Sequence, residues 1–219
     1  MMKGDRSGRL ENEVLNKLTT NYTYFVRESK HFEYLEREIL PSYQADRMER
    51  LSIWCGGCSS GEECYTLSML LHSYVRKGGS LPEFQILGTD ISENSLKKAR
   101  EARYSINELK RIPDEWQREY LDVDYKNEWF EVRSAIRKEV AFCRMNLMKP
   151  FAGQRQYDII FCRNVMIYFD EGSRKKLLKR LYGCLKPGGY LFLGHAELLY
   201  RDNDLFQYVC PAVYQKTGK

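Results

Sequence analysis

The segment WCGGCSSGEECYT, residues Trp54–Thr66, joins a short apolar run to a longer amphipathic one. The apolar run RLSIWC ends at a Gly-Gly pair, which is typical of a buried strand that stops in a tight turn. The residues that follow, GEECYTLSMLLHSYVRKGG, repeat apolar side chains at helical spacing and end in a second Gly-Gly pair. The segment is therefore predicted to be the loop of a strand–loop–helix unit.

Strand-like and helix-like segments alternate along the rest of the chain. EFQILGTD is a predicted strand, and Ser92 can cap the predicted helix SENSLKKAREARY after it. YDIIFCRN precedes the predicted helix DEGSRKKLLKRLYGCLKPGG, which is expected to stop at Pro-Gly-Gly. Further predicted strands are VAFCRMNL, YLFLGHA, FQYVC and AVYQK. This alternation favours an α/β fold with a doubly wound, parallel sheet.

Two regions depart from the alternation. Residues 1–45 form a predicted N-terminal helical segment, in which ENEVLNKLTTNYTYFVRESKHFEYLEREIL is helical in character up to Pro41. Residues 46–219 form the main domain, with an antiparallel β insert at about residues 104–138. In the insert, NELKRIPDEWQREY predicts short helices, and YLDVDY, EWFEVRSAI and EVAFCRM predict strands, the first two joined by a turn at Lys126-Asn127. The insert is either a decorated loop or a flap that docks a substrate or partner.

The composition is that of an ordinary globular protein. The 219 residues are 43% hydrophobic and 30% charged, with a net charge of +5 that does not demand a nucleic-acid partner. No apolar run approaches the roughly 20 residues that span a bilayer, and the first residues lack the apolar core of a signal peptide. The seven cysteines are therefore expected to be reduced thiols in the cytoplasm.

The three cysteines of the opening segment admit a metal or redox interpretation. A structural zinc site needs about four ligands, yet Cys55 and Cys58 have no second C-x-x-C, and the three histidines are scattered along the sequence. A redox pair usually has its second cysteine at the start of the helix, whereas Cys58 is still in the loop. The sequence therefore favours a glycine loop that lets a cofactor approach the backbone, with no metal.

The type of cofactor follows from what the loop contains. Neither G-x-G-x-x-G nor G-x-x-x-x-G-K-[ST] is present, so the fingerprints for nucleotide phosphates fail. Glu62 and Glu63 lie at the predicted helix start, where a phosphate would otherwise bind. Two carboxylates there suit a cationic ligand. Acids at a helix start more often serve as capping residues. Asp90 ends a predicted strand, where an acid can bind ribose hydroxyls. A ribose and a cation without phosphate point to S-adenosylmethionine.

Five segments together resemble the CheR family of chemotaxis receptor methyltransferases. They are TTNYTYFVRESKHFEYL, IWCGGCSSGEECYTLSMLL, ILGTDISENSLKKAR, FCRNVMIYFD and LKPGGYLFLGHAE, and the resemblance covers about residues 19–216. It implies a class I, Rossmann-like methyltransferase that uses S-adenosylmethionine to methylate glutamate side chains on the cytoplasmic domains of chemoreceptors, which adapts chemotactic signalling.

The resemblance also implies the roles of particular residues. Those expected to bind the cofactor are Asn21, Thr23, Arg27, Glu63, Asp90, Asn146, Leu147, Asn164 and Val165. Arg27 and Tyr168 are expected to act in catalysis, near the sulfonium and the substrate carboxylate. A glutamate carboxylate is already ionised at pH 7, so the reaction needs positioning and desolvation of the reactants and no general base.

Some features depart from the family pattern. Gly57 adds slack to the loop, which usually reads A-[AC]-S-[ST]-G-E-E, and only about twenty residues precede the T-N motif where a basic helical domain is usual. The insert loop DVDYKNEWF has no glycine, so recruitment is expected not to use a receptor C-terminal pentapeptide. The rival functions are a regulatory module that binds the cofactor without transfer and a methyltransferase on another substrate. A nucleic-acid enzyme is disfavoured because no [DNS]-P-P-[YFW] signature is present, and a monomer without membrane insertion is expected.

Overall fold

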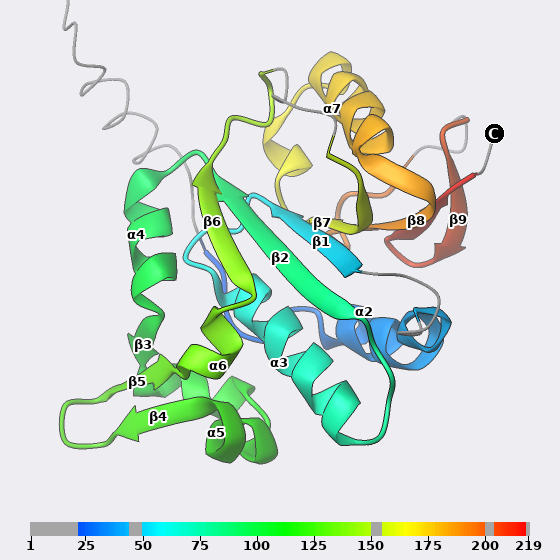
Figure 1. Cartoon of the computed structure of the whole chain (residues 1–219). Coiled ribbons are helices and arrows are strands. Elements are labelled where there is room, and N and C mark those ends of the chain that lie inside the picture. The colour runs from blue at the N-terminus through cyan, green and yellow to red at the C-terminus, as the bar shows by residue number, and fades with distance from the viewer. Residues whose placement is uncertain (1–21, 44–49, 150–154, 200–203, 218–219) are drawn as a thin grey trace, which may run out of the picture.

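The computed structural model describes residues 22–43, 50–149, 155–199 and 204–217. Figure 1 shows a twisted central sheet with helices on both faces and a second, smaller sheet below it. The doubly wound α/β fold with a mostly parallel main sheet and a small antiparallel sheet is therefore confirmed. Among the described residues, no helix is both long and apolar enough to cross a membrane.

The main sheet has seven strands in the order β6-β2-β1-β7-β8-β10-β9. The first five are parallel to their neighbours, and β10 runs antiparallel to β8 and β9. The chain proceeds from β1 outward to β2 and β6 and then crosses back to β7, so the switch point lies between β1 and β7, where open α/β sheets bind ligands. The strands are β1 (Arg50–Gly56), β2 (Glu83–Asp90), β6 (Val140–Arg144), β7 (Tyr157–Cys162), β8 (Leu185–Leu193), β9 (Phe206–Cys210) and β10 (Val213–Lys216).

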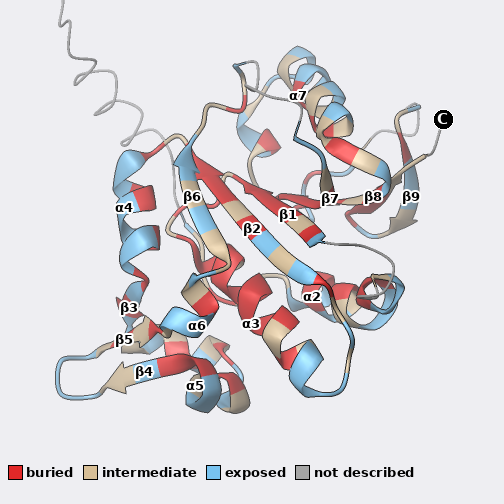
Figure 2. Cartoon of the chain, in the orientation of Figure 1, coloured by how far each residue is buried: buried red, intermediate tan, exposed pale blue. Residues whose placement is uncertain are grey.

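Helices cover both faces of this sheet. α3 (Glu62–Arg76) and α4 (Glu93–Glu101) lie on one face and α7 (Glu171–Cys184) on the other (Figure 1). Alternate residues of β1 therefore enter different cores: Ile53 and Cys55 pack with α3, and Trp54 packs with α7. Figure 2 shows the resulting burial along the inner strands. Ser92 caps α4 by accepting a hydrogen bond from the Ser95 N–H, as predicted.

The predicted end of the last long helix is wrong. α7 stops at Cys184, and β8 already begins at Leu185, so the Pro-Gly-Gly sequence lies within the strand. The pairing of β7 with β8 shifts register between Tyr157 and Ile159, and Gly188, with a φ of 76°, lies in the irregular part of β8. Gly189 lies so close to the Asp158 carbonyl oxygen that an added Cβ would be 2.8 Å from it.

Part of the predicted N-terminal helix is wrong within the described residues, and its predicted residues 11–21 lie outside them. Residues 22–28 are not helical: residues 25–28 form turns, in which Val26 and Glu28 have positive φ angles of 56° and 58°. Tertiary contacts hold this segment: Phe25 is fully buried against Tyr104 and Phe130 of the small sheet. The helical part comprises α2 (Ser29–Tyr34), a π-helical turn (Leu35–Ile39) and a 3₁₀ turn (Leu40–Ser42).

The small sheet has three antiparallel strands in the order β3-β5-β4. The predicted short helices and the polar turn before β5 are present. EVAFCRM is not part of this sheet, because it supplies β6 of the main one, and the third strand is β3 instead. The elements are β3 (Arg103–Ser105), a 3₁₀ helix (Ile106–Arg111), α5 (Asp114–Tyr120), β4 (Leu121–Asp124), β5 (Trp129–Val132) and α6 (Ser134–Arg137). The domain boundaries given above stay predictions.

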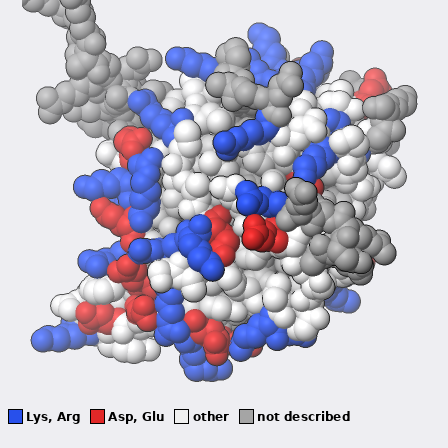
Figure 3. Space-filling model, viewed as in Figure 1, with Lys and Arg blue, Asp and Glu red and all other residues white. Residues whose placement is uncertain are grey.

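Charges of both signs are interspersed over α4 and the small sheet on the face shown in Figure 3. Ion pairs join some of them, such as Arg100 with Glu93 at 2.6 Å and Arg103 with Glu131 at 3.4 Å. Such a mixed surface differs from the single-sign basic stripe that is typical of nucleic-acid-binding domains.

Candidate active site

A cavity of about 510 Å³ opens at the carboxyl ends of β1, β2, β6 and β7, next to the switch point. It brings together all the described residues that the sequence predicts for the site: Thr23, Arg27, Glu63, Asp90, Asn146, Leu147, Asn164, Val165 and Tyr168. The remaining predicted residue, Asn21, lies outside the described residues. The volume is within the range of small-molecule and cofactor sites.

The loop after β1 forms one wall of this cavity. The N–H groups of Gly57 and Cys58 both donate to the Thr89 carbonyl, at 2.7 and 2.9 Å, which ties the loop to the end of β2. Gly57 has a φ of 79°, and a Cβ there would lie 2.4 Å from a methyl carbon of Val165. The extra glycine therefore does not add slack, because its missing side chain lets the loop pack against the turn after β7.

Asp90 lies where β2 ends and is 7% exposed. One carboxylate oxygen accepts from the Ser59 N–H and the other from the Ser92 N–H, both at 2.8 Å. Burial raises the pKa of Asp90, and these backbone hydrogen bonds oppose that rise. A carboxylate has about four acceptor positions, so this one is fixed in place and can still accept hydrogen bonds from a ligand in the cavity.

The two adjacent glutamates have different environments. Glu63 lines the cavity and forms an ion pair with Arg163 at 3.0 Å. Glu62 is not among the lining residues, and its carboxylate accepts from the Ser60 hydroxyl at 2.9 Å. Glu62 therefore fits the interpretation as a residue of the helix start, and only Glu63 fits the interpretation as a partner for a cationic ligand.

Burial raises the pKa of Glu62 from 4.5 to about 7. Between these values the folded chain holds a proton that the unfolded chain has released, so this contribution to stability is complete below about pH 4.5 and is lost as the pH rises through about 7. We expect Glu62→Gln to remove this loss, which is on the order of 3 kcal/mol. Urea unfolding at about pH 5 and pH 8 measures it, with the exposed Glu83→Gln as control. Equal pH slopes for wild type and Glu62→Gln would contradict the assignment.

Sequence reasoning missed Arg163, the residue that follows β7. Its side chain is 2% exposed and pairs with Glu63 and with Glu28, each at 3.0 Å, and it also donates to the Arg27 carbonyl. Burial raises the pKa of both glutamates, and the positive charge of Arg163 lowers it. The net result is a lowered pKa for Glu28 and a raised pKa for Glu63. The three charged side chains sum to one negative charge beside the cavity, which suits a cation. The sequence signal for this residue was its place directly after the strand-like run YDIIFC, at the edge of the sheet where cofactors bind.

Two of the three histidines, His31 and His195, lie together in the fold. The rings of His31 and His195 lie 4.9 Å apart, and Glu28 lies 3.5 Å from Nδ1 of His31. These three side chains form a group that could hold a metal ion. Burial and Arg163 lower the pKa of His31 to about 4, and Arg163 already pairs with the carboxylate. Because this positive neighbour opposes a second cation, we assign no metal to the group.

The cysteines of the opening segment are packed as neutral thiols. Cys55, Cys58 and Cys64 are buried and free of disulfides. Burial raises the pKa of Cys55 to about 12 and those of the other two well above the usual value. The thiolate is the form that binds metals and attacks electrophiles, so their environment favours a packing role.

Arg27 and Tyr168 lie at the mouth of the cavity. The Arg27 guanidinium donates to the Tyr22 carbonyl at 2.8 Å, and its Cζ lies 5.8 Å from the centroid of the Tyr24 ring. Glu28 pairs with Arg163 and Glu33 with Lys30, so the acids next to Arg27 in sequence have other partners. Tyr168 is 58% exposed. An arginine at the rim with its charge not neutralised by these acids can receive an anionic substrate.

The chain is similar to one protein family and to several known proteins. Residues 21–214 match the family described as CheR methyltransferase, SAM binding domain. The chain is 40% identical to a chemotaxis protein methyltransferase of Borreliella burgdorferi, over 93% of this chain and 73% of that protein. It is 39% identical to chemotaxis protein methyltransferase 1 of Pseudomonas aeruginosa, over 92% and 75%. Among solved structures, the glycopeptide N-methyltransferase MtfA with S-adenosylmethionine is 13% identical, with a TM-score of 0.47 over 78% of this chain and 54% of that one.

Proposed function

This chain belongs to the CheR methyltransferase family, and on that basis we propose that it methylates glutamate side chains on the cytoplasmic domains of chemoreceptors. Its cofactor is S-adenosylmethionine, and it acts as a methyltransferase in chemotaxis. The chemotaxis methyltransferases among its relatives disfavour a regulatory module without transfer. We place the reaction in the cytoplasm and expect the chain to act as a monomer.

The residues of the cavity fit this cofactor. Asp90, which keeps acceptor capacity, would bind the ribose hydroxyls, and the net negative group around Glu63 would face the cationic methionine end. The Asn146 side chain accepts from the Met148 N–H at 2.8 Å, which fixes the turn that presents Leu147 as an apolar surface for the adenine. When bound, S-adenosylmethionine supplies an electrophilic methyl group on a sulfonium.

One observation carries the choice of a carboxylate as acceptor. Among the described residues that line the cavity there is an arginine at the mouth but neither a histidine nor a lysine. The two lining carboxylates that could act as bases are already engaged, Glu63 by Arg163 and Asp90 by two backbone N–H groups. An amine or hydroxyl acceptor must lose a proton during transfer, whereas a glutamate is ionised beforehand. Arg27 and Tyr168 would orient that carboxylate, and the remaining task is desolvation and alignment.

The proposal is tested by incubating the chain with methyl-labelled cofactor and receptor cytoplasmic fragments. We expect label on glutamate that is released by mild base, because methyl esters hydrolyse and N-methyl groups do not. A fragment whose acceptor glutamates are replaced by alanine is the control. Base-stable label, or equal labelling of the control, would refute glutamate O-methylation.

The same assay with fragments that lack the receptor's C-terminus tests the expected independence from a pentapeptide.

Asp90→Ala should weaken binding of S-adenosylhomocysteine by about 1–3 kcal/mol, because the ribose hydroxyls would lose their acceptor and the Ser59 and Ser92 N–H groups would lose theirs. Isothermal titration calorimetry measures the change. Asp122→Ala, an exposed acid of β4 that pairs with Arg133, is the control. Unchanged affinity in Asp90→Ala would remove Asp90 from the cofactor site.

A further inference from the structure

We propose that Glu197 is a positioning residue that holds the turn after β7, Asn164–Phe169, against the cofactor cavity. Its Oε2 accepts from the N–H groups of Asn164 at 2.7 Å and Gly194 at 2.8 Å. Its Oε1 accepts from the Ile167 N–H at 3.2 Å. The residue is 5% exposed, so these three backbone donors converge on a carboxylate that is nearly removed from water.

The turn that Glu197 holds supplies much of the proposed site. Asn164, Val165, Tyr168 and Phe169 all line the cavity. Asn164 has a φ of 58°, a left-handed conformation that asparagine adopts more readily than most residues. Val165 packs directly on Gly57 of the cofactor loop. A shift of the turn would therefore reach the cofactor loop as well as the mouth of the cavity.

The site at Glu197 presents three backbone N–H donors, and a carboxylate matches them because both of its oxygens are acceptors. Because β7 and β8 are parallel neighbours, the segments that follow them emerge at the same edge of the sheet, and Glu197 bridges the two. A Cβ at Gly194 would lie 2.6 Å from the Asn164 side-chain nitrogen and 2.9 Å from Oε2 of Glu197. A glutamine would direct its NH₂ group at backbone donors, because only one of its two terminal atoms accepts hydrogen bonds.

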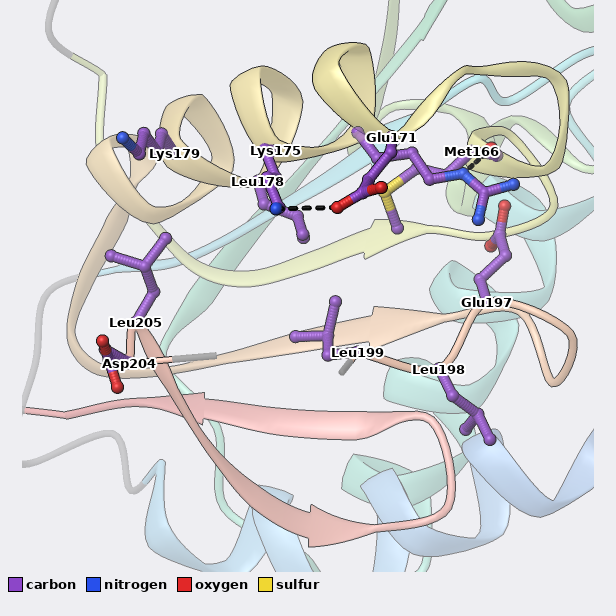
Figure 4. A pocket seen from close by; sticks show the side chains of 11 residues that line it. Met166, Glu171, Lys175, Leu178, Lys179, Glu197, Leu198, Leu199, Asp204 and Leu205 are labelled. Carbon is purple, nitrogen blue, oxygen red and sulfur yellow. Dashed lines mark hydrogen bonds and ion pairs between the residues drawn. The ribbon is translucent and has the colours of Figure 1, made fainter. Parts of the chain in front are cut away.

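A second cavity lies on the other side of this turn. It has a volume of about 300 Å³ and is lined by Met166, Glu197, Leu178 and charged residues of α7, and leucines of the segment after β8. Figure 4 shows Glu197 at its edge, on the loop after β8, with Leu198 and Leu199 following. This space would let a small anion reach the three N–H groups if the glutamate side chain were shortened.

The inference rests on the proposed cofactor site and is tested by binding of S-adenosylhomocysteine, which needs no methyl acceptor. We expect Glu197→Gln to raise the Kd roughly tenfold or more, since at least one buried N–H loses its acceptor. Glu197→Ala should lose affinity to a similar or greater extent, and sodium formate should restore part of it where sodium chloride at equal ionic strength does not. Leu198→Ala, which lines the same cavity and is 62% exposed, is the control and should bind as wild type.

Melting temperatures are recorded for all variants so that affinities are compared between folded proteins. Melting temperatures well above that of the assay exclude a general loss of folding, and restoration by formate then shows that the missing carboxylate acceptor causes the loss of affinity. Wild-type affinity in Glu197→Gln would overturn the inference, and this variant decides alone if Glu197→Ala does not fold. If the wild-type chain does not bind S-adenosylhomocysteine, the cofactor site itself is refuted and the inference with it.

Discussion

Arg27→Ala is expected to lower the turnover number on a receptor fragment by about 10–150-fold, with a smaller change in cofactor affinity. This range corresponds to the loss of one charge-assisted hydrogen bond, about 1.5–3 kcal/mol. Arg27 lies at the mouth of the cavity, while Glu28 and Glu33 next to it in sequence pair with other cations. Its guanidinium is thus placed to orient an incoming carboxylate, an interaction that matters most during transfer.

The matched variants sharpen this expectation. Arg27→Lys should restore the rate only in part, because a lysine keeps the charge but loses the planar fork. Tyr168→Phe should slow transfer more mildly, and Arg50→Ala, at the end of β1 opposite the cavity, should leave the rate unchanged. Initial rates at saturating cofactor give the turnover numbers, and calorimetry gives the cofactor affinity. Wild-type turnover in Arg27→Ala would show that this arginine is a surface residue without a role in catalysis.

Much of the fold could be predicted because its signals are local. The apolar run before Gly56, the helical period after Gly61 and the cap at Ser92 each fix one element from a few neighbouring residues. Asp90 could be proposed for the same reason, since an acid at the end of a parallel strand lies at the edge where such sheets bind cofactors. These signals depend only on neighbouring residues in the chain, so they can be recognised without knowledge of the tertiary fold.

What the sequence could not predict depends on contacts between distant segments. The helical pattern around Phe25 was misleading, because burial of this ring against the small sheet holds the backbone in turns. In the sequence, Arg163 and Glu197 are ordinary charged residues. In the fold, Arg163 lies between two glutamates, and Glu197 accepts hydrogen bonds from the turn after β7. Asn21 and the role of the insert in recruitment stay predictions.

Arg163→Met should destabilise the fold by about 3–5 kcal/mol, the usual cost of removing one partner from a buried ion pair. The Arg163 side chain is 2% exposed, and those of Glu28 and Glu63 are 14% and 15% exposed. Without the guanidinium, both acids would remain in a poorly solvated site beside each other. Urea unfolding at neutral pH measures the loss. Arg133→Met, whose ion pair with Asp122 is at the surface, should cost no more than about 1 kcal/mol.

The pH dependence tests whether the loss is electrostatic. In the wild type, Arg163 lowers the pKa of Glu28, so that contribution is present above the unfolded pKa of about 4.5 and is lost as the pH falls through the folded value. In Arg163→Met, burial without the cation would raise the pKa of both acids, and the variant would lose stability as the pH rises. The deficit in unfolding free energy should therefore be largest near pH 7 and shrink toward about pH 5.

Arg163→Lys should show a smaller deficit, because a single ammonium keeps the charge but cannot reproduce the three directed contacts. A deficit that is constant with pH would mean that Arg163 stabilises the fold by packing alone, for instance through its position over Phe32 at 5.4 Å, and not by holding the two acids.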